Sequence, residues 1–207
     1  MKLICLIGSP RGKNGNTGRL AAEVLRGARS QGAKAEVIAL KGNSIRPCRA
    51  CDRCHIEGHC PQRDDFEDLK AKILAADGLV LASPNYINQV SAQLKAFIDR
   101  TYSYLTPDFM TAAKKHRLPP GKKLVFIQTQ GADDPALFGD IFPRYNAFFE
   151  PLGYFDQSWF LRGCALNEPN GVQGRQDLLD QALTVAREIV AASTVDTASA
   201  GRRPKIS

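Results

Sequence analysis

The chain begins with a short apolar run that ends in a loop of glycine, serine, asparagine and threonine. The run is Leu3–Ile7, and the loop reads Gly-Ser-Pro-Arg-Gly-Lys-Asn-Gly-Asn-Thr-Gly over 8–18. A continuous apolar run of this kind is typical of a strand buried in a parallel sheet. A helical pattern follows, so the loop lies at a helix N-terminus, where unpaired N–H groups and the helix dipole favour an anion. This stretch therefore predicts a phosphate site.

The remaining chain alternates strands and helices. Further strands are expected over 35–40, 78–83, 123–129 and 154–161, and helices over 19–31, 66–75, 91–104, 137–151 and 175–192. This order predicts an α/β fold with a doubly wound parallel sheet and right-handed crossovers. Ligands bind such sheets at the carboxyl ends of the strands. We therefore expect the loops after the first, third and fourth strands, at 9–17, 84–90 and 130–134, to converge.

Composition narrows the class of protein. A chain of 207 residues is long enough for one domain, expected over 1–193, followed by a disordered basic tail over 194–207. No apolar run reaches the roughly 20 residues that cross a bilayer, and the start lacks signal-peptide order, so we expect a cytoplasmic protein without a membrane partner. The net charge of +7 comes without a basic face interleaved with aromatics, so no nucleic-acid partner is expected. A basic balance does suit an anionic cofactor.

The phosphate loop lacks two common motifs. A P-loop ends in Gly-Lys-Ser/Thr, whereas Lys13 is followed by Asn14. The dinucleotide fingerprint needs Gly-x-Gly-x-x-Gly and an acidic residue after the second strand, and this chain has Leu40-Lys41 there. A loop with serine, asparagine, threonine and one arginine fits a single phosphate monoester, such as that of FMN.

Three segments together resemble the NAD(P)H-dependent FMN reductases and iron–sulfur flavoproteins, which are flavodoxin-like. They are the loop with Gly8-Ser9-Pro10-Arg11 and Gly15-Asn16-Thr17, the segment from Ser83-Pro84-Asn85-Tyr86 to the helical 90–100, and Thr129-Gln130-Gly131. The resemblance implies a five-stranded sheet of order 2-1-3-4-5. It also implies that Ser9, Arg11, Asn16 and Thr17 hold the FMN phosphate. Pro84, Asn85 and Tyr86 would line the isoalloxazine ring, and Gln130 and Gly131 would approach its other side.

Four of the six cysteines fall within thirteen residues of a long loop at 42–63 that has no regular period. They are Cys48, Cys51, Cys54 and Cys60, whereas Cys5 and Cys164 are interpreted as buried small hydrophobes. Cysteines spaced x2, x2 and x5 can close around a [4Fe–4S] cubane, as related runs do in ferredoxins. Structural zinc, a c-type haem attachment at Cys51–His55 and a thioredoxin-like Cys-x-x-Cys fit the spacing or the context less well. Reduced thiols without any metal remain the simplest alternative.

The compact cysteine spacing resembles that of the iron–sulfur flavoproteins. That resemblance implies that a [4Fe–4S] cluster held by Cys48, Cys51, Cys54 and Cys60 exchanges electrons with FMN in a multimeric protein. The cysteine loop follows the edge strand of the expected sheet, so a neighbouring subunit's flavin would be the nearer partner. We therefore expect a homo-oligomer, a dimer or a tetramer.

These observations predict an FMN-dependent oxidoreductase. Electrons would come from NAD(P)H or a reduced carrier and pass to an acceptor, a small molecule or a protein, that the sequence does not identify. No side-chain acid or base is expected, since the flavin carries the chemistry. A non-catalytic flavodoxin-like electron carrier and a thiol or zinc redox sensor on the same fold are the alternatives.

Overall fold

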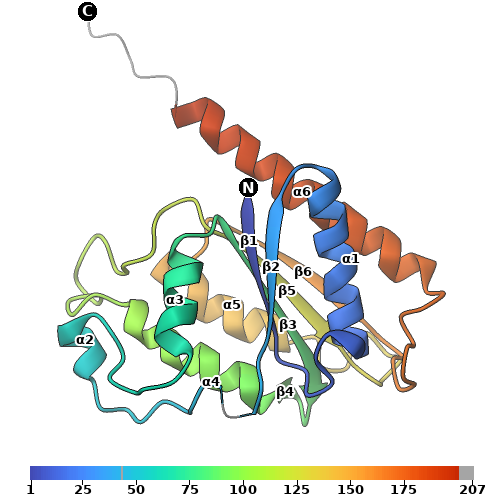
Figure 1. Ribbon diagram of the computed structural model, residues 1–207, viewed down its shortest axis with the longest axis horizontal. Coiled ribbons are helices and arrows are strands. Elements are labelled where there is room, and N and C mark those ends of the chain that lie inside the picture. Colours follow the sequence, from blue (N-terminus) through green and yellow to red (C-terminus); the bar gives the residue numbers. More distant parts are fainter. Residues whose placement is uncertain (43, 201–207) are drawn as a thin grey trace, which may run out of the picture.

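The computed structural model describes residues 1–42 and 44–200, and its centre is a sheet flanked by helices (Figure 1). Five strands are parallel and lie in the order β2 (Lys34–Ala39), β1 (Lys2–Ile7), β3 (Gly78–Tyr86), β5 (Lys123–Thr129) and β6 (Gln157–Gly163). The short β4 (Gln89–Val90) pairs antiparallel with the end of β3. Counted along the chain, the five parallel strands have the predicted order 2-1-3-4-5, which is confirmed.

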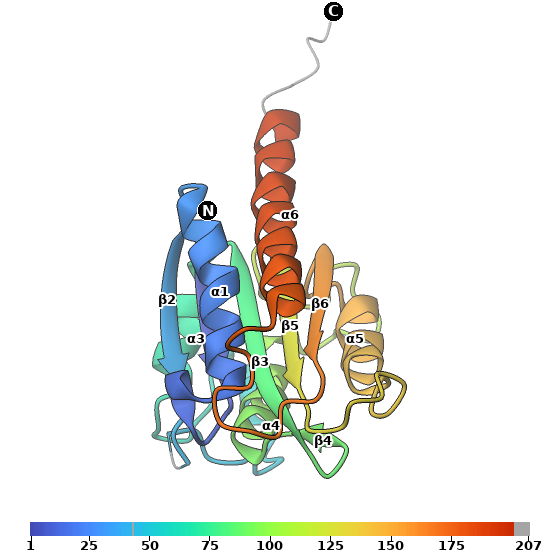
Figure 2. The same ribbon diagram turned by 90° about the vertical axis from the view of Figure 1, so that its right-hand side faces the viewer.

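Helices cover both faces of the sheet (Figure 2). One face carries α1 (Asn16–Ser30) and α6 (Gln176–Ala200), and the other carries α3 (Phe66–Leu74), α4 (Ala92–Arg100) and α5 (Ile141–Leu152). The alternation of β1 supplies both cores, because successive side chains of a strand point to opposite faces. Leu3, Cys5 and Ile7 pack with α1 and α6, whereas Ile4 and Leu6 pack with the helices opposite.

Several element boundaries differ from the sequence-based expectation. The single helix expected over 91–104 is α4 followed by a tighter turn, η2 (Thr101–Tyr104), and the fifth main strand begins at Gln157 rather than Tyr154. The hairpin between β3 and β4 was not predicted, because Ile87 and Asn88 close it with positive φ angles of 48° and 55° that asparagine tolerates but isoleucine rarely adopts.

Three segments that were expected to lack regular structure contain helix. The cysteine loop at 42–63 includes the short α2 (Arg53–Glu57), and the phosphate loop includes a short helical turn, η1 (Gly12–Asn14). The tail was expected to be disordered from 194 onward. Instead α6 continues to Ala200, and residues 201–207 lie outside the described part of the chain.

Candidate functional site

A cavity of about 190 Å³ lies at the carboxyl edge of the sheet, and we call it the edge cavity. All nine residues predicted from the sequence to contact a flavin line it: Ser9, Arg11, Asn16, Thr17, Pro84, Asn85, Tyr86, Gln130 and Gly131. Sheet pairing explains why they meet. Pro84 is the register partner of Thr129, and the N–H of Gly8 donates to the carbonyl of Ala82 at 2.8 Å. The ends of β1, β3 and β5 therefore converge on one cavity.

The anion-binding character of the edge cavity comes from the start of α1. The helix begins at Asn16, directly behind η1, and no side chain caps it. Its first-turn N–H groups have no intrahelical acceptor and carry the positive end of the helix dipole. Close packing fixes this arrangement, because a Cβ at Gly18 would lie 2.4 Å from the carbonyl oxygen of Gly12. Beside it, the Ser9 hydroxyl accepts the N–H of Arg11 at 3.3 Å and so keeps its own proton to donate.

The side chain of Asn16 already has partners within the protein. Its Nδ2 donates to the carbonyls of Leu166 (3.2 Å) and Glu168 (2.9 Å), and its Oδ1 accepts the N–H of Val172 at 3.3 Å. The side chain thus ties the segment after β6 to the start of α1. What Asn16 can offer to an anion is its backbone N–H.

Two other predicted residues are also partly engaged. The hydroxyl of Thr17 shares a 2.6 Å hydrogen bond with that of Thr129. Gln130 is buried, its Nε2 donates to the carbonyls of Asp134 and Leu137, and its Oε1 accepts from Gln128 at 3.0 Å. The Gln130 side chain therefore shapes the loop after β5.

The segment Pro84–Tyr86 is the end of β3 and lines one side of the edge cavity. The Oδ1 of Asn85 is buried and has no hydrogen-bond partner among the residues that the structure describes. A buried acceptor without a donor is rare in a finished fold. A ligand N–H group in the cavity would satisfy it.

Three lining residues were not predicted: Thr129, Leu166 and Asn167. The last two follow β6, and Asn167 donates to the carbonyl of Gly131 at 3.0 Å. A Cβ at Gly131 would lie 2.0 Å from the Oδ1 of Asn167, so the glycine makes room for this side chain. The sequence-based prediction named only the loops after the first, third and fourth strands. The convergence rule, applied to the fifth strand as well, would have included this segment, since the carboxyl end of every parallel strand lies at the same edge.

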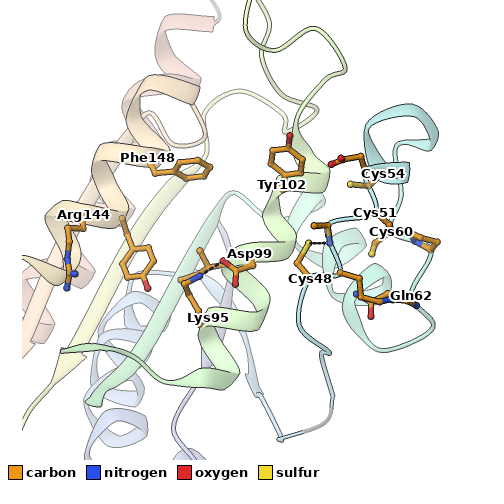
Figure 3. A pocket seen from close by; sticks show the side chains of 16 residues that line it. Cys48, Cys51, Cys54, Cys60, Gln62, Lys95, Asp99, Tyr102, Arg144 and Phe148 are labelled. Carbon is orange, nitrogen blue, oxygen red and sulfur yellow. Dashed lines mark hydrogen bonds and ion pairs between the residues drawn. The ribbon is translucent and has the colours of Figure 1, made fainter. Parts of the chain in front are cut away.

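A second cavity, of about 580 Å³, lies on the face of the sheet that carries α4 and α5, and we call it the thiol cavity (Figure 3). Its walls are the cysteine loop on one side and α4, Tyr102 and α5 on the other. The predicted metal ligands Cys48, Cys51, Cys54 and Cys60 all line it. The opposite wall carries aromatic and charged side chains, including Lys95, Asp99, Tyr102, Arg144 and Phe148.

The four cysteines share a cavity but do not form a closed ligand set. In the described residues, no group of three or more Cys, His, Asp or Glu side chains is placed to hold a metal ion. Cys48 and Cys51 are exposed, and Cys54 and Cys60 are half-buried. The backbone around Cys51 is unusual, because Ala50 and Asp52 have positive φ angles of 48° and 54°. Non-glycine residues adopt this region only when their surroundings impose it.

A buried ion pair anchors the start and the end of the cysteine loop. Arg100 of α4 contacts Asp64 at 2.5 Å, and both side chains are at most 4% exposed. Asp64 also accepts the backbone N–H of Arg46 at 2.8 Å, and the Arg100 guanidinium donates to the Arg46 carbonyl at 3.2 Å. Burial by itself would raise the pKa of Asp64, but hydrogen bonds from Arg100 and from two backbone N–H groups lower it below its usual value.

A second brace lies under α2. The backbone N–H of Cys60 donates to Glu67 at 2.6 Å, and the ammonium of Lys70 donates to the carbonyl of Gly58 at 2.7 Å. The guanidinium of Arg117 donates to the carbonyl of His55 at 2.9 Å, and the His55 ring stacks on Tyr102 with 4.3 Å between centroids. The cysteine loop is therefore held by hydrogen bonds from three other segments.

The six cysteines differ in their electrostatic environment. Cys5 is buried in the core as predicted, and burial raises its pKa to about 12, so the thiol stays protonated. Partial burial raises the pKa of Cys54, and the neighbouring thiolate charges of Cys60, Cys48 and Cys51 raise it further. Cys164 was expected to be buried in a strand, but it follows β6 and is half-buried. The effect on Cys54 agrees with the placement of all four loop cysteines on one cavity.

The fold and the edge cavity together define a flavodoxin-like α/β protein with an anion-binding loop after its first strand. The family model described as NADPH-dependent FMN reductase matches residues 1–136, and the chain belongs to this family. No helix of the described residues has the length and apolar character that crossing a membrane requires.

Curated proteins similar to this chain fall in two groups. An iron–sulfur flavoprotein of Methanocaldococcus jannaschii is 43% identical over 101 residues, which are 49% of this chain and 52% of that protein. One of Archaeoglobus fulgidus is 38% identical over 104 residues, 50% of this chain and 47% of that protein. The chain thus spans about half the length of these relatives. YwqN of Bacillus subtilis, provisionally named an NAD(P)H-dependent FMN-containing oxidoreductase, is 30% identical over 175 residues, 82% of this chain and 86% of that protein.

The solved structures support the fold. The NAD(P)H:quinone oxidoreductase from Methanothermobacter marburgensis superposes with a TM-score of 0.70 at 18% identity, covering 91% of this chain and 96% of that chain. At this level of identity the similarity concerns the architecture of the sheet and its helices.

Proposed function

We propose that this chain binds FMN in the edge cavity and passes electrons from NAD(P)H or a reduced carrier to an acceptor. The observation that carries the proposal is convergence. Nine residues from three separate segments, picked out by their resemblance to a flavin site, line one cavity beside the uncapped start of α1. The residues fit the cofactor, because the cavity offers N–H groups for a phosphate and, for a ring N–H, the Oδ1 of Asn85, which has no hydrogen-bond partner among the described residues.

The chain's own groups divide the work of binding. The first-turn N–H groups of α1, the hydroxyl of Ser9 and the guanidinium of Arg11 would hold the phosphate. Asn85, Tyr86 and the backbone at Gly131 would contact the ring. FMN supplies the redox chemistry when bound, since it accepts a hydride from a nicotinamide and passes on one or two electrons. The protein positions the ring and leaves one face accessible.

The phosphate assignment is tested by comparing FMN with riboflavin, which lacks the phosphate. Arg11→Gln is expected to weaken FMN binding by about tenfold to a hundredfold, the usual effect of losing a hydrogen bond to a charged group. It should leave riboflavin affinity unchanged. The matched control is Arg26→Gln, because Arg26 is also an exposed arginine but pairs with Glu23 on α1, outside the cavity.

Titrations of flavin fluorescence give the affinities of the unaltered chain and of both variants for FMN and for riboflavin. Equal losses for FMN and riboflavin would show that Arg11 contacts something other than the phosphate. Failure of the unaltered chain to bind FMN would overturn the proposal as a whole.

We further propose that Cys48, Cys51, Cys54 and Cys60 hold a [4Fe–4S] cluster that exchanges electrons with the flavin. Support comes from the compact spacing, the shared cavity, the left-handed residues around Cys51 and the similarity to proteins named iron–sulfur flavoproteins. Thiolates are the ligands that such clusters take. To bind the cluster, the exposed part of the loop that carries Cys48 and Cys51 would have to move toward Cys54 and Cys60.

Iron and acid-labile sulfide measured after anaerobic purification test this proposal. Cys51→Ser is expected to lose most of the iron, whereas Cys164→Ser, a change at a half-buried cysteine outside the thiol cavity, should keep it. Zinc in place of iron would support the redox-sensor alternative. Thiols that titrate fully without any bound metal would leave an FMN protein without a cluster.

The choice between an enzyme and a non-catalytic carrier depends on turnover. We propose an enzyme, so steady-state oxidation of NADH or NADPH with an artificial acceptor should depend on bound FMN. A carrier would be reduced once without turnover.

We also propose a homo-oligomer in which the thiol cavity of one subunit faces the flavin of another. Sedimentation showing only monomers would contradict this arrangement.

A further inference from the structure

Lys70 of α3 is a lysine whose side chain is buried beneath the cysteine loop. The residue is 5% exposed, and its ammonium donates to the carbonyl of Gly58 at 2.7 Å. A second carbonyl, that of Ser103, lies at 3.5 Å. Lysine is rarely buried without a countercharge, because transfer of an ammonium out of water costs several kcal/mol even after relaxation.

The countercharge that the chain itself supplies to Lys70 is incomplete. Glu67 is its nearest carboxylate, with Oε2 at 3.9 Å from the ammonium, but Oε1 of the same group accepts the N–H of Cys60 at 2.6 Å. A second cation, Arg117, lies on the same side, since it donates to the carbonyls of His55 and Ser103. Lys70 therefore has one half-buried carboxylate at 3.9 Å and the ring of Tyr104 at 5.7 Å, with a second cation nearby.

The cysteine loop lies directly against this buried ammonium. Lys70 contacts Gly58, and its ion-pair partner Glu67 contacts Cys60, so the ammonium sits directly behind the segment that carries the thiols. Burial lowers the pKa of Lys70, and the charges of Glu67 and of the Cys54 and Cys60 thiolates oppose that shift. The contact with Gly58 places the ammonium beside the part of the loop that lies between Cys54 and Cys60.

We propose that Lys70 is the electrostatic positioning residue of the thiol cavity, the buried countercharge to the metal group bound by the four cysteines. The inference rests on the proposed cluster. A cluster with four thiolates is anionic, and its reduction adds one electron without making or breaking a bond. A fixed ammonium behind the loop stabilises the more negative, reduced state. Lys70 therefore raises the reduction potential and favours electron entry.

The test is a redox titration of the anaerobically purified holoprotein, followed by electron paramagnetic resonance of the reduced cluster. Lys70→Met keeps the length of the side chain and removes the charge, and it is expected to lower the midpoint potential. Lys70→Arg keeps the charge and should restore it. Lys72→Met is the matched control, because Lys72 lies on the same helix with an exposed ammonium paired to Glu36.

A second readout separates charge from simple bracing. Removing a buried charge should leave the metal-free protein equally or more stable to urea, while the loaded Lys70→Met protein should release iron to a chelator severalfold faster than the unaltered protein. A mere brace would weaken both forms, and that result, or an unchanged midpoint potential, would overturn the role of Lys70. An unaltered chain that never holds iron would overturn the cluster proposal first, and this inference with it.

Discussion

The edge cavity and the thiol cavity are built by opposite means. Around the edge cavity, the polar side chains of Asn16, Thr17 and Gln130 use most of their hydrogen-bonding capacity within the protein, mainly on backbone groups. What remains for a ligand is the backbone N–H groups at the start of α1 and a few side chains such as Ser9 and Arg11. Around the thiol cavity, the four thiols form no closed ligand set within the described part of the chain, and the charged side chains of Arg100 and Lys70 contact the loop or the segment that ends it. The first site is preformed on strands and a helix. The second is a loop held in place by buried charges.

This difference has a consequence for stability. Neutral hydrogen bonds near the edge cavity contribute about 0.5–1.5 kcal/mol each, so losing one should be tolerated. Breaking a buried ion pair leaves an uncompensated charge and costs about 3–5 kcal/mol. Mutations should therefore affect the two regions differently, the first through ligand affinity and the second through folding.

The largest effect is expected for Asp64→Ala. The change leaves the guanidinium of Arg100 buried with no carboxylate, and two of its nitrogens, Nε and Nη2, already lack partners among the described residues. We expect a loss of about 3–5 kcal/mol in the free energy of unfolding, measured by urea denaturation. The control is Asp99→Ala, because Asp99 forms an exposed pair with Lys95, and such pairs contribute about 0–1 kcal/mol. Equal losses at the two positions would show that Asp64 is no stronger an anchor than a surface pair.

The Asp64 carboxylate should also make the unfolding free energy of the protein depend on pH in the acid range. The pKa of Asp64 is lowered in the folded protein, so its contribution is present above the unfolded value of 3.8 and is lost as the pH falls through the lower folded value. The difference in unfolding free energy between the unaltered chain and Asp64→Asn should be constant near neutral pH and shrink below about pH 4. A difference that is independent of pH down to 2 would show that Asp64 is not ionised in the fold.

Asn16→Ala is expected to have an intermediate effect. The three hydrogen bonds from its side chain to the segment after β6 are lost, and we expect a cost of about 2 kcal/mol because that segment can partly resolvate. FMN affinity should fall as well, since Leu166 and Asn167 would no longer be held at the cavity. The control is Asn146→Ala on α5, where the side chain donates one hydrogen bond, to Glu150 four residues along the same helix at 3.1 Å. Hydrogen exchange should quicken over 164–174 in Asn16→Ala alone.

How far the sequence predicts each region follows from the range of the interactions involved. The apolar run before Ser9 and the alternation of strands and helices predict the sheet order and the edge cavity, because register and crossover rules bring the strand ends together. The partners of Asn16 lie some 150 residues away, so its structural use could not be read from a local motif. The same holds for Asp64 with Arg100 and for Lys70 with Gly58, which meet only once α3 and α4 have packed. The cysteine spacing predicted a metal site, but no local pattern predicted the buried charges that hold the cysteine loop.

Gly131→Ala should have the smallest effect on stability, and its consequences should be limited to the edge cavity. The added Cβ would meet the Oδ1 of Asn167 at 2.0 Å, but this is the end of an exposed side chain that can move, so we expect about 1 kcal/mol or less in stability. FMN affinity should fall severalfold, because the displaced Asn167 lines the cavity and loses its bond to the Gly131 carbonyl. If the clash is the cause, Gly131→Ala should cost much less affinity in an Asn167→Ala background, and the double-mutant cycle gives the coupling. Additive losses would mean that the Cβ meets the flavin itself rather than Asn167, and that Gly131 lies closer to the ring than the edge cavity suggests.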